Sequence, residues 1–233
     1  MELSKVLEKE LLEGRFWTHS KTLVEGCTKI STGCQNCWSE AMQMRFNGGK
    51  PFDGTIVEHP DRCMDILPKS NNRKQRVWTY WNDIFHDGVS DDLRNTLFKK
   101  IFLSLDYHII CTKRPDNAVS YFERRNHPAG HTFVLVTMEN QEMVQRRWKA
   151  AAKLASIGVR VGLLIEPMLS PIEIDPSWLD FMSWIICGPE NGKGKRPFDG
   201  QWAMRLQAQA QAAGVPFLYK AGLLNGKRYI ETP

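Results

Sequence analysis

Three of the six cysteines in this chain lie within eleven consecutive residues, and this cluster limits the possible folds more than any other feature. Cys27, Cys34 and Cys37 occur in the sequence GCTKISTGCQNCWSE (residues 26–40), with the spacing C-x6-C-x2-C. Because this stretch holds few large apolar side chains, we expect a loop rather than a buried strand or helix. Such a loop suits a disulfide, a zinc ion or an iron–sulfur cluster.

A disulfide is the least favoured of these three. The N-terminal sequence MELSKVLEKELLEGRFW mixes charged residues with Leu and Val and lacks the apolar core of a signal peptide. No apolar run reaches the roughly 18 residues that a membrane span requires. We therefore expect a cytoplasmic protein without membrane contact, and cytosolic thiols stay reduced.

Zinc and an iron–sulfur cluster differ in how many protein ligands they need. A structural zinc site takes four ligands, usually from two paired knuckles. Only one knuckle is present here, and His19, His59 and Cys63 are not at the spacing of a second one. Three thiolates suit a cluster in which one iron keeps an open coordination position. The other two cysteines, Cys111 and Cys187, we expect to be buried as small apolar side chains, like Cys63.

The rest of the chain alternates apolar runs with amphipathic segments, which is typical of a parallel sheet covered by helices on both faces. With a further possible strand before the cysteines, the pattern predicts an α/β fold, a partial or complete TIM-type (βα) barrel. A doubly wound open sheet is the alternative. Without an internal linker, we expect residues 1–233 to form a single domain with the cysteine loop (26–40) after the first strand. The predicted strands are 76–81, 107–111, 132–137, 160–165, 183–187 and 215–220, and the predicted helices are 90–104, 140–158 and 201–214.

Nearly every predicted strand runs directly into a charged or amide side chain. In a βα barrel the loops after the strands form the active site. One such residue is as readily a helix N-cap or a solvated charge, but the whole set predicts a shared polar site on one rim. The glycine-rich loop 188–197 is also suited to hold an anion with backbone N–H groups. The rim residues are Asn82, Asp83, His86, Lys113, Arg114, Glu139, Asn140, Glu166, Glu190, Asn191, Arg196 and Lys220.

Seven segments of the chain also point to a family. In order, they are GCTKISTGCQNCWSEAM, VWTYWNDIFHDGV, CTKRPD, VTMENQ, LLIEPMLSPIEI, WIICGPENGKGKRPFD and QAAGVPFLYK. Over nearly its whole length the chain resembles the phage and bacterial proteins of the phage gene-product thirty-seven/sixty-eight family, a domain of unknown function with a three-cysteine motif. The resemblance implies a phage protein with a TIM-barrel-like fold, related to the radical S-adenosylmethionine (SAM) enzymes.

This resemblance implies a 4Fe–4S cluster on Cys27, Cys34 and Cys37 that cleaves SAM to a 5′-deoxyadenosyl radical. Two departures stand out: the usual radical SAM spacing is C-x3-C-x2-C, and the family's Gly-Gly-Glu-Ser is replaced by residues 187–191, CGPEN. Barrel position assigns the SAM amine to Asn82 and Asp83 and the SAM ribose to Glu139 and Asn140. The residues left for substrate are Lys113, Arg114, Glu166, Glu190 and Arg196.

We therefore expect a radical SAM enzyme that takes a small-molecule or nucleotide substrate, such as a DNA base, and an external electron donor. The net charge of +5 is compatible with a nucleic-acid partner. Two alternatives remain. One is a non-catalytic zinc- or cluster-binding module for nucleic acid. The acidic side chains that accompany the basic ones on the rim argue against it. The other is a TIM-barrel hydrolase that uses the rim carboxylates.

Overall fold

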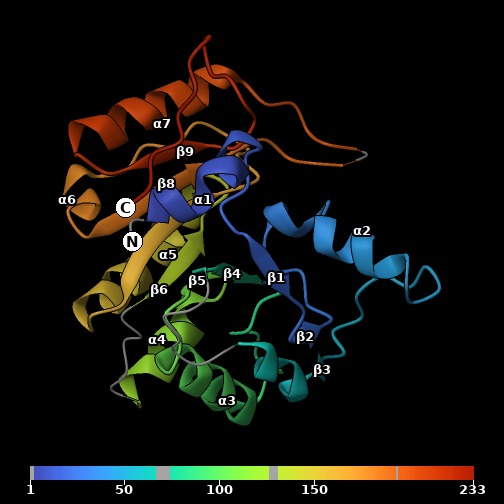
Figure 1. Ribbon diagram of the computed structural model, residues 1–233. Helices are drawn as coiled ribbons and strands as arrows, with labels where there is room; N and C mark the ends of the chain where they lie inside the picture. The colour runs from blue at the N-terminus through green and yellow to red at the C-terminus, as the bar shows by residue number, and fades with distance from the viewer. Residues whose placement is uncertain (1–2, 67–73, 126–130, 193) are drawn as a thin grey trace.

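The computed structural model describes residues 3–66, 74–125, 131–192 and 194–233. Residues 1–2, 67–73 and 126–130 lie outside this part, as does Lys193 of the predicted anion-binding loop. A seven-stranded parallel sheet in the order β1-β4-β5-β6-β7-β8-β9 forms its centre (Figure 1). The strands are β1 (His19–Lys21), β4 (Val77–Tyr80), β5 (Tyr107–Thr112), β6 (Thr132–Thr137), β7 (Arg160–Ile165), β8 (Met182–Cys187) and β9 (Phe217–Tyr219).

The strand order decides between the two predicted architectures. In a doubly wound sheet the order reverses at a switch point, whereas here each strand of the sheet lies beside the next one along the chain. Within the described residues β1 pairs with β4 alone among the strands of the sheet, and the free edge of β9 bonds residues 229–231 rather than β1, so the sheet stays open. The fold is thus α/β with a parallel half-barrel, and the doubly wound alternative is wrong.

The predicted first strand is β1, but the cysteine loop does not follow it directly. A short strand, β2 (Val24–Glu25), comes first and pairs antiparallel with β3 (Val57–Glu58). The predicted loop also ends in regular structure, because α2 begins at Trp38. The unstructured part of the cysteine loop is therefore shorter than its sequence predicts.

Helices follow most strands and cover the outer face of the sheet. Ser90 accepts a hydrogen bond from the Leu93 amide and caps α3, as the Ser-Asp-Asp start predicts. That helix ends at Phe102, two residues before the predicted end at residue 104. The helices are α1 (Leu3–Leu12), α2 (Trp38–Met44), α3 (Asp91–Phe102), α4 (Pro115–Glu123), α5 (Gln141–Ser156), α6 (Pro176–Leu179) and α7 (Gly200–Ala212), with 3₁₀ helices η1 (Thr32–Cys34) and η2 (Pro60–Asp65).

The inner face of the half-barrel is filled by the N-terminal helix. Leu3, Leu7 and Leu11 repeat at every fourth position of α1, and all three are buried. They belong to an apolar cluster that is separate from the one beneath the outer helices, and Figure 1 shows α1 on the opposite side of the sheet from α5. The sheet side of this cluster consists of Val77, Ile109, Phe133, Leu135, Leu164, Trp184, Ile186 and Leu218.

We predict that Leu7→Ala destabilises the protein by about 2–5 kcal/mol, because it removes a fully buried side chain and leaves a cavity between α1 and the sheet. Leu12 ends the same helix and is 52% exposed, so Leu12→Ala should change stability by less than about 0.5 kcal/mol. Urea unfolding of both variants measures the difference. Equal effects would contradict the placement of α1.

Candidate functional site

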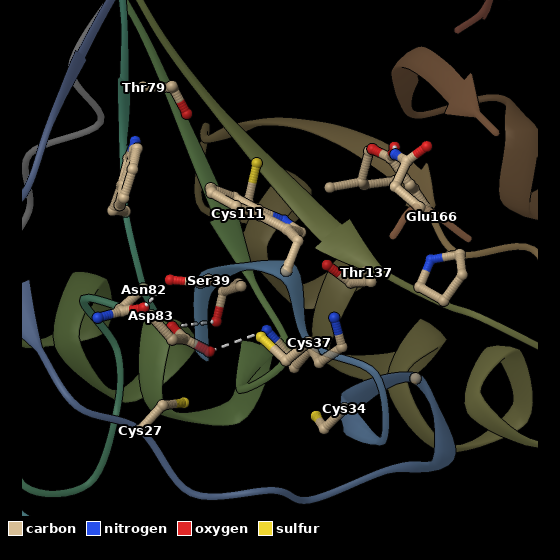
Figure 2. A pocket seen from close by; sticks show the side chains of 18 of the residues that line it. Cys27, Cys34, Cys37, Ser39, Thr79, Asn82, Asp83, Cys111, Thr137 and Glu166 are labelled. Carbon is tan, nitrogen blue, oxygen red and sulfur yellow. Dashed lines mark hydrogen bonds between the residues drawn. The ribbon is translucent and has the colours of Figure 1, made fainter. Parts of the chain in front are cut away.

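A cavity of about 340 Å³ opens at the carboxyl-terminal edge of the sheet, beneath the cysteine loop. Cys27, Cys34 and Cys37 all line it, as do Thr79, Cys111 and Thr137 from the strands. Figure 2 shows the three loop cysteines on one side of the cavity and Glu166 on another. The three thiols that lie together in sequence therefore face one space.

The predicted rim residues divide into two groups. Among the described residues that line the cavity are Asn82, Asp83, Lys113, Arg114, Glu166 and Glu190. Glu139, Asn140 and Arg196 are not among these lining residues, and they lie behind or beside the cysteine loop. Much of the rim therefore contacts the loop rather than the space under it.

Glu139 anchors the middle of the loop. Its carboxylate is fully buried and accepts a hydrogen bond of 2.7 Å from Nη1 of Arg147 on α5. The Ser31 hydroxyl donates to its other oxygen. Gly33 packs so closely on this side chain that a Cβ there would lie 2.1 Å from Glu139 Cγ. Next to it, Asn140 caps α5 by accepting from the Met143 amide and donates to Thr32 Oγ1.

Glu190 and Arg196 hold the other side of the loop. Arg196 forms an ion pair with the buried Glu190 carboxylate and donates to it from Nε at 2.9 Å, while its Nη1 donates to Thr32 O at 3.0 Å. Asn36 donates to the same carboxylate at 3.0 Å. The hydrogen bonds from Arg196, together with that from Asn36, lower the pKa of Glu190 to about 2 although burial opposes this. The carboxylate is therefore charged at neutral pH.

Arg114 and His86 fix the start of the loop at Thr28. Arg114 Nη2 donates to Thr28 Oγ1 at 2.6 Å and to Thr28 O at 3.2 Å. His86 Nδ1 accepts from the Gly88 amide, so its Nε2 carries the proton and donates to Thr28 Oγ1 at 2.9 Å. Burial, together with the charge of Arg114, lowers the pKa of His86, which keeps the ring neutral.

Asn82 and Asp83, the residues predicted to hold the SAM amine, already have several protein partners. Asn82 has φ of 60°, a left-handed conformation that Asn tolerates, and its side chain bonds Ser39 Oγ and Val24 O. The buried Asp83 carboxylate accepts from Thr112 Oγ1, from the amides of Phe85 and Lys113, and from Arg114. Their contact with SAM stays a prediction.

A charged pair lies at the sheet side of the cavity, away from the loop anchors. Lys220, just after β9, forms an ion pair with Oε2 of Glu166, just after β7. Asn191 donates to Glu166 Oε1 at 3.3 Å. The Lys220 ammonium also lies 5.1 Å from the ring centroid of Phe16 and 5.4 Å from that of Trp17. These groups line the cavity. Among the hydrogen bonds of the described residues, none joins them to the cysteine loop.

The loop thiols lie in different surroundings. Burial raises the pKa of Cys27, while Arg114, with Nη1 at 3.9 Å from Sγ, acts in the opposite direction. Cys34 Sγ lies 3.6 Å from Ser31 Oγ, and Cys37 precedes α2 without a side-chain capping bond. Within the described ranges, no three His, Cys, Asp or Glu side chains gather closely enough to hold a metal ion.

The remaining cysteines differ from one another. Cys111 lines the cavity, and burial raises the pKa of its thiol to about 12. Cys63 and Cys187 are fully buried in the apolar cluster beneath the outer helices, as their sequence context predicts. His59 pairs with Glu25, and neither His59 nor Cys63 is among the residues that line the cavity with the loop thiols.

A family model described as a protein of unknown function (DUF5131) matches residues 15–227 of the chain. The chain belongs to this family. No curated protein and no solved structure matches it. The DUF5131 description gives neither a phage origin nor radical SAM chemistry, so both stay proposals. No helix in the described part of the chain is long and apolar enough to cross a membrane, and the cellular compartment stays a prediction.

The residues of the cysteine loop that bond the rim side chains were not predicted from the sequence. Thr28, Ser31 and Thr32 stand between the cysteines of this DUF5131 chain and bond the rim side chains, yet isolated hydroxyl residues in a loop carry no distinctive pattern. Arg147 on α5 was also missed, although it shares the buried helix face of Met143, Ala151 and Leu154, where a charged side chain needs a partner. For the loop itself, the available signal was the number of small polar residues between the first two cysteines.

We predict that Glu190→Gln loosens the loop and costs about 2 kcal/mol at neutral pH, because it removes a charge that Arg196 and Asn36 share. The folded pKa lies below the ordinary value, so this stabilisation is present above about pH 4.5 and is lost as pH falls toward about 2. The measurement is amide hydrogen exchange across residues 28–37, together with urea unfolding at pH 7 and pH 3.5.

The matched control is Glu142→Gln, which removes a carboxylate that is 65% exposed on α5. It should leave both measurements unchanged. If the Glu190 variant matched this control at pH 7, the anchoring role of Glu190 would be wrong.

Proposed function

We propose that this chain is a radical SAM enzyme that acts on a nucleotide or a nucleic-acid base. The observation that carries the proposal is the convergence of Cys27, Cys34 and Cys37 on one cavity at the carboxyl-terminal edge of a parallel half-barrel. Active sites of barrel enzymes lie at this edge. Three thiols, with a large space beside them, suit a group that needs both protein ligands and room for a second molecule.

Three cysteine ligands suit a cluster with one open iron better than a structural zinc ion. A structural zinc ion draws four ligands to one point, and the described residues contain no such set of His, Cys, Asp or Glu. In a 4Fe–4S cluster each cysteine binds a different iron, so the sulfurs stay farther apart. Cys27, Cys34 and Cys37 would hold three irons, and the fourth would face the cavity.

When bound and reduced, such a cluster supplies one electron to the sulfonium of SAM and thereby starts radical chemistry on the substrate. The protein's part is to hold the loop rigid and to orient the ligands. Asn82, Asp83, Glu139 and Asn140 remain our proposed SAM contacts, although SAM must share or replace their present partners. Of these four, only Asn82 and Asp83 line the cavity.

Aromatic rings support a flat heteroaromatic substrate. Trp17, Trp38 and Trp81 line the cavity together with Phe16 and Phe52. Trp38 is 51% exposed and packs edge-to-face on Trp81, with ring centroids 5.2 Å apart. A base that stacks on such a ring gains about 1–3 kcal/mol. Partly exposed indoles beside polar groups are therefore the surface expected around a base.

We divide the residues predicted to bind substrate into those that contact it directly and those that act indirectly. Lys113 and Glu166 face the cavity and suit direct contact, the lysine with phosphate and the carboxylate with N–H groups of a base. Arg114, Glu190 and Arg196 hold the cysteine loop. We therefore propose that they affect substrate binding indirectly, by fixing the position of this loop. The hydrolase alternative loses support, because Glu139 and Glu190 are both committed to arginine partners.

We predict that the protein, purified and reconstituted without oxygen, binds about four iron and four sulfide per chain. Cys27→Ala, Cys34→Ala and Cys37→Ala should each lower the iron content strongly, because each removes one iron ligand. Iron and sulfide analysis, with electron paramagnetic resonance of the reduced protein, measures this. Added SAM should shift the resonance signal, since it binds the open iron.

Cys63→Ala is the matched control, because it removes a thiol that lies in the apolar core and away from the cavity. Its iron content should equal that of the unchanged protein. Stoichiometric zinc without iron would overturn the proposal and favour the nucleic-acid-binding module, whereas a protein without either metal would favour the hydrolase.

We further predict that Lys113→Ala weakens nucleotide binding about tenfold, which is the loss of one charge-assisted contact. Titration of a nucleoside monophosphate against tryptophan fluorescence measures the affinity. The control Lys149→Ala removes an exposed lysine on the outer helix α5 and should have no effect. Equal affinities for the two variants would remove Lys113 from the site.

A further inference from the structure

A buried guanidinium lies directly behind the first loop cysteine. The Arg114 side chain, between β5 and α4, is only 6% exposed. Its Nη1 lies 3.9 Å from Cys27 Sγ and 3.4 Å from Asp83 Oδ2. Because its Nη2 donates twice to Thr28, the guanidinium is fixed in place relative to the sulfur.

The charges around Arg114 leave a positive group at the sulfur. Asp83 is its buried counter-charge, yet that carboxylate also accepts from Thr112 and from the Lys113 amide. Asp87, on the Nε side, has a side chain that is 73% exposed and is screened by water. A lysine could not reach the sulfur, Thr28 and Asp83 at once, since only a guanidinium has donors along a planar fork.

We propose that Arg114 is a positioning residue that raises the reduction potential of the cluster through Cys27. This inference rests on the proposed function. Reduction adds negative charge to the cluster, so a fixed cation and an N–H···S contact stabilise the reduced form more than the oxidised form. Hydrogen bonds to sulfur and local charge are the established means by which a protein sets such potentials.

The test is a redox titration of the reconstituted protein, without SAM, followed by electron paramagnetic resonance. Arg114→Gln should make reduction about tenfold less favourable, which for one electron is a potential lower by about 59 mV. Arg114→Lys keeps the charge but loses the planar fork of donors, so its reduction potential should lie between those of the unchanged protein and of Arg114→Gln. Arg146→Gln is the matched control, because it removes the same charge from an arginine that is 65% exposed, and its potential should be unchanged.

A second variant covers the case in which Arg114→Gln cannot hold a cluster. Asp83→Asn removes the buried negative charge beside the guanidinium, so its potential should rise. If the potential of Arg114→Gln equals that of Arg146→Gln, or if the potential of Asp83→Asn does not rise, the role of Arg114 is wrong while the proposed function stands. An unchanged protein that binds no iron overturns the proposed function itself.

Discussion

The candidate site depends on one constraint: the cysteine loop has almost no secondary structure of its own, so side chains from the sheet must hold it. Glu139 with Arg147, Glu190 with Arg196, and Arg114 with Asp83 are ion pairs that contact the loop from different strand ends. Each involves a buried carboxylate, and a buried charge is costly unless it is fully paired. The three pairs together favour a single loop position, because a shift of the loop breaks the hydrogen bonds that Ser31, Asn36 and Thr28 make to them.

This constraint changes how the polar rim is understood. A charged residue after a buried strand is expected to face a ligand, and half of the charged residues predicted here hydrogen-bond the cysteine loop. The residues that remain for a substrate, apart from the proposed SAM contacts, are fewer and more distinct: Lys113, the Glu166–Lys220 pair and the tryptophans. The chain thus separates the groups that build the site from the groups that remain available within it.

The sequence was sufficient for the sheet and insufficient for the details of the site. Apolar runs such as residues 132–137 coincide with β6, because burial on both faces makes such strands continuous in hydrophobicity. The strand ends followed from the same pattern, and the clustering of the three cysteines followed from their spacing in the sequence. Which side chain meets which loop atom could not be predicted, because the path of a loop depends on contacts across 58 to 164 positions of sequence, such as His86 to Thr28 and Arg196 to Thr32. The N-terminal helix was missed for another reason: its leucines match any surface helix, and only the half-barrel makes their position internal.

That helix has a consequence for where the folding unit begins. The family match covers residues 15–227, whereas α1 lies before it and Glu231, which bonds Trp184 and Phe217, lies after it. A fragment cut at the family boundaries would expose Leu164, Trp184 and their neighbours as one continuous apolar surface. The segment matched by the family model and the segment that covers the inner apolar face of the sheet are therefore different lengths of this chain.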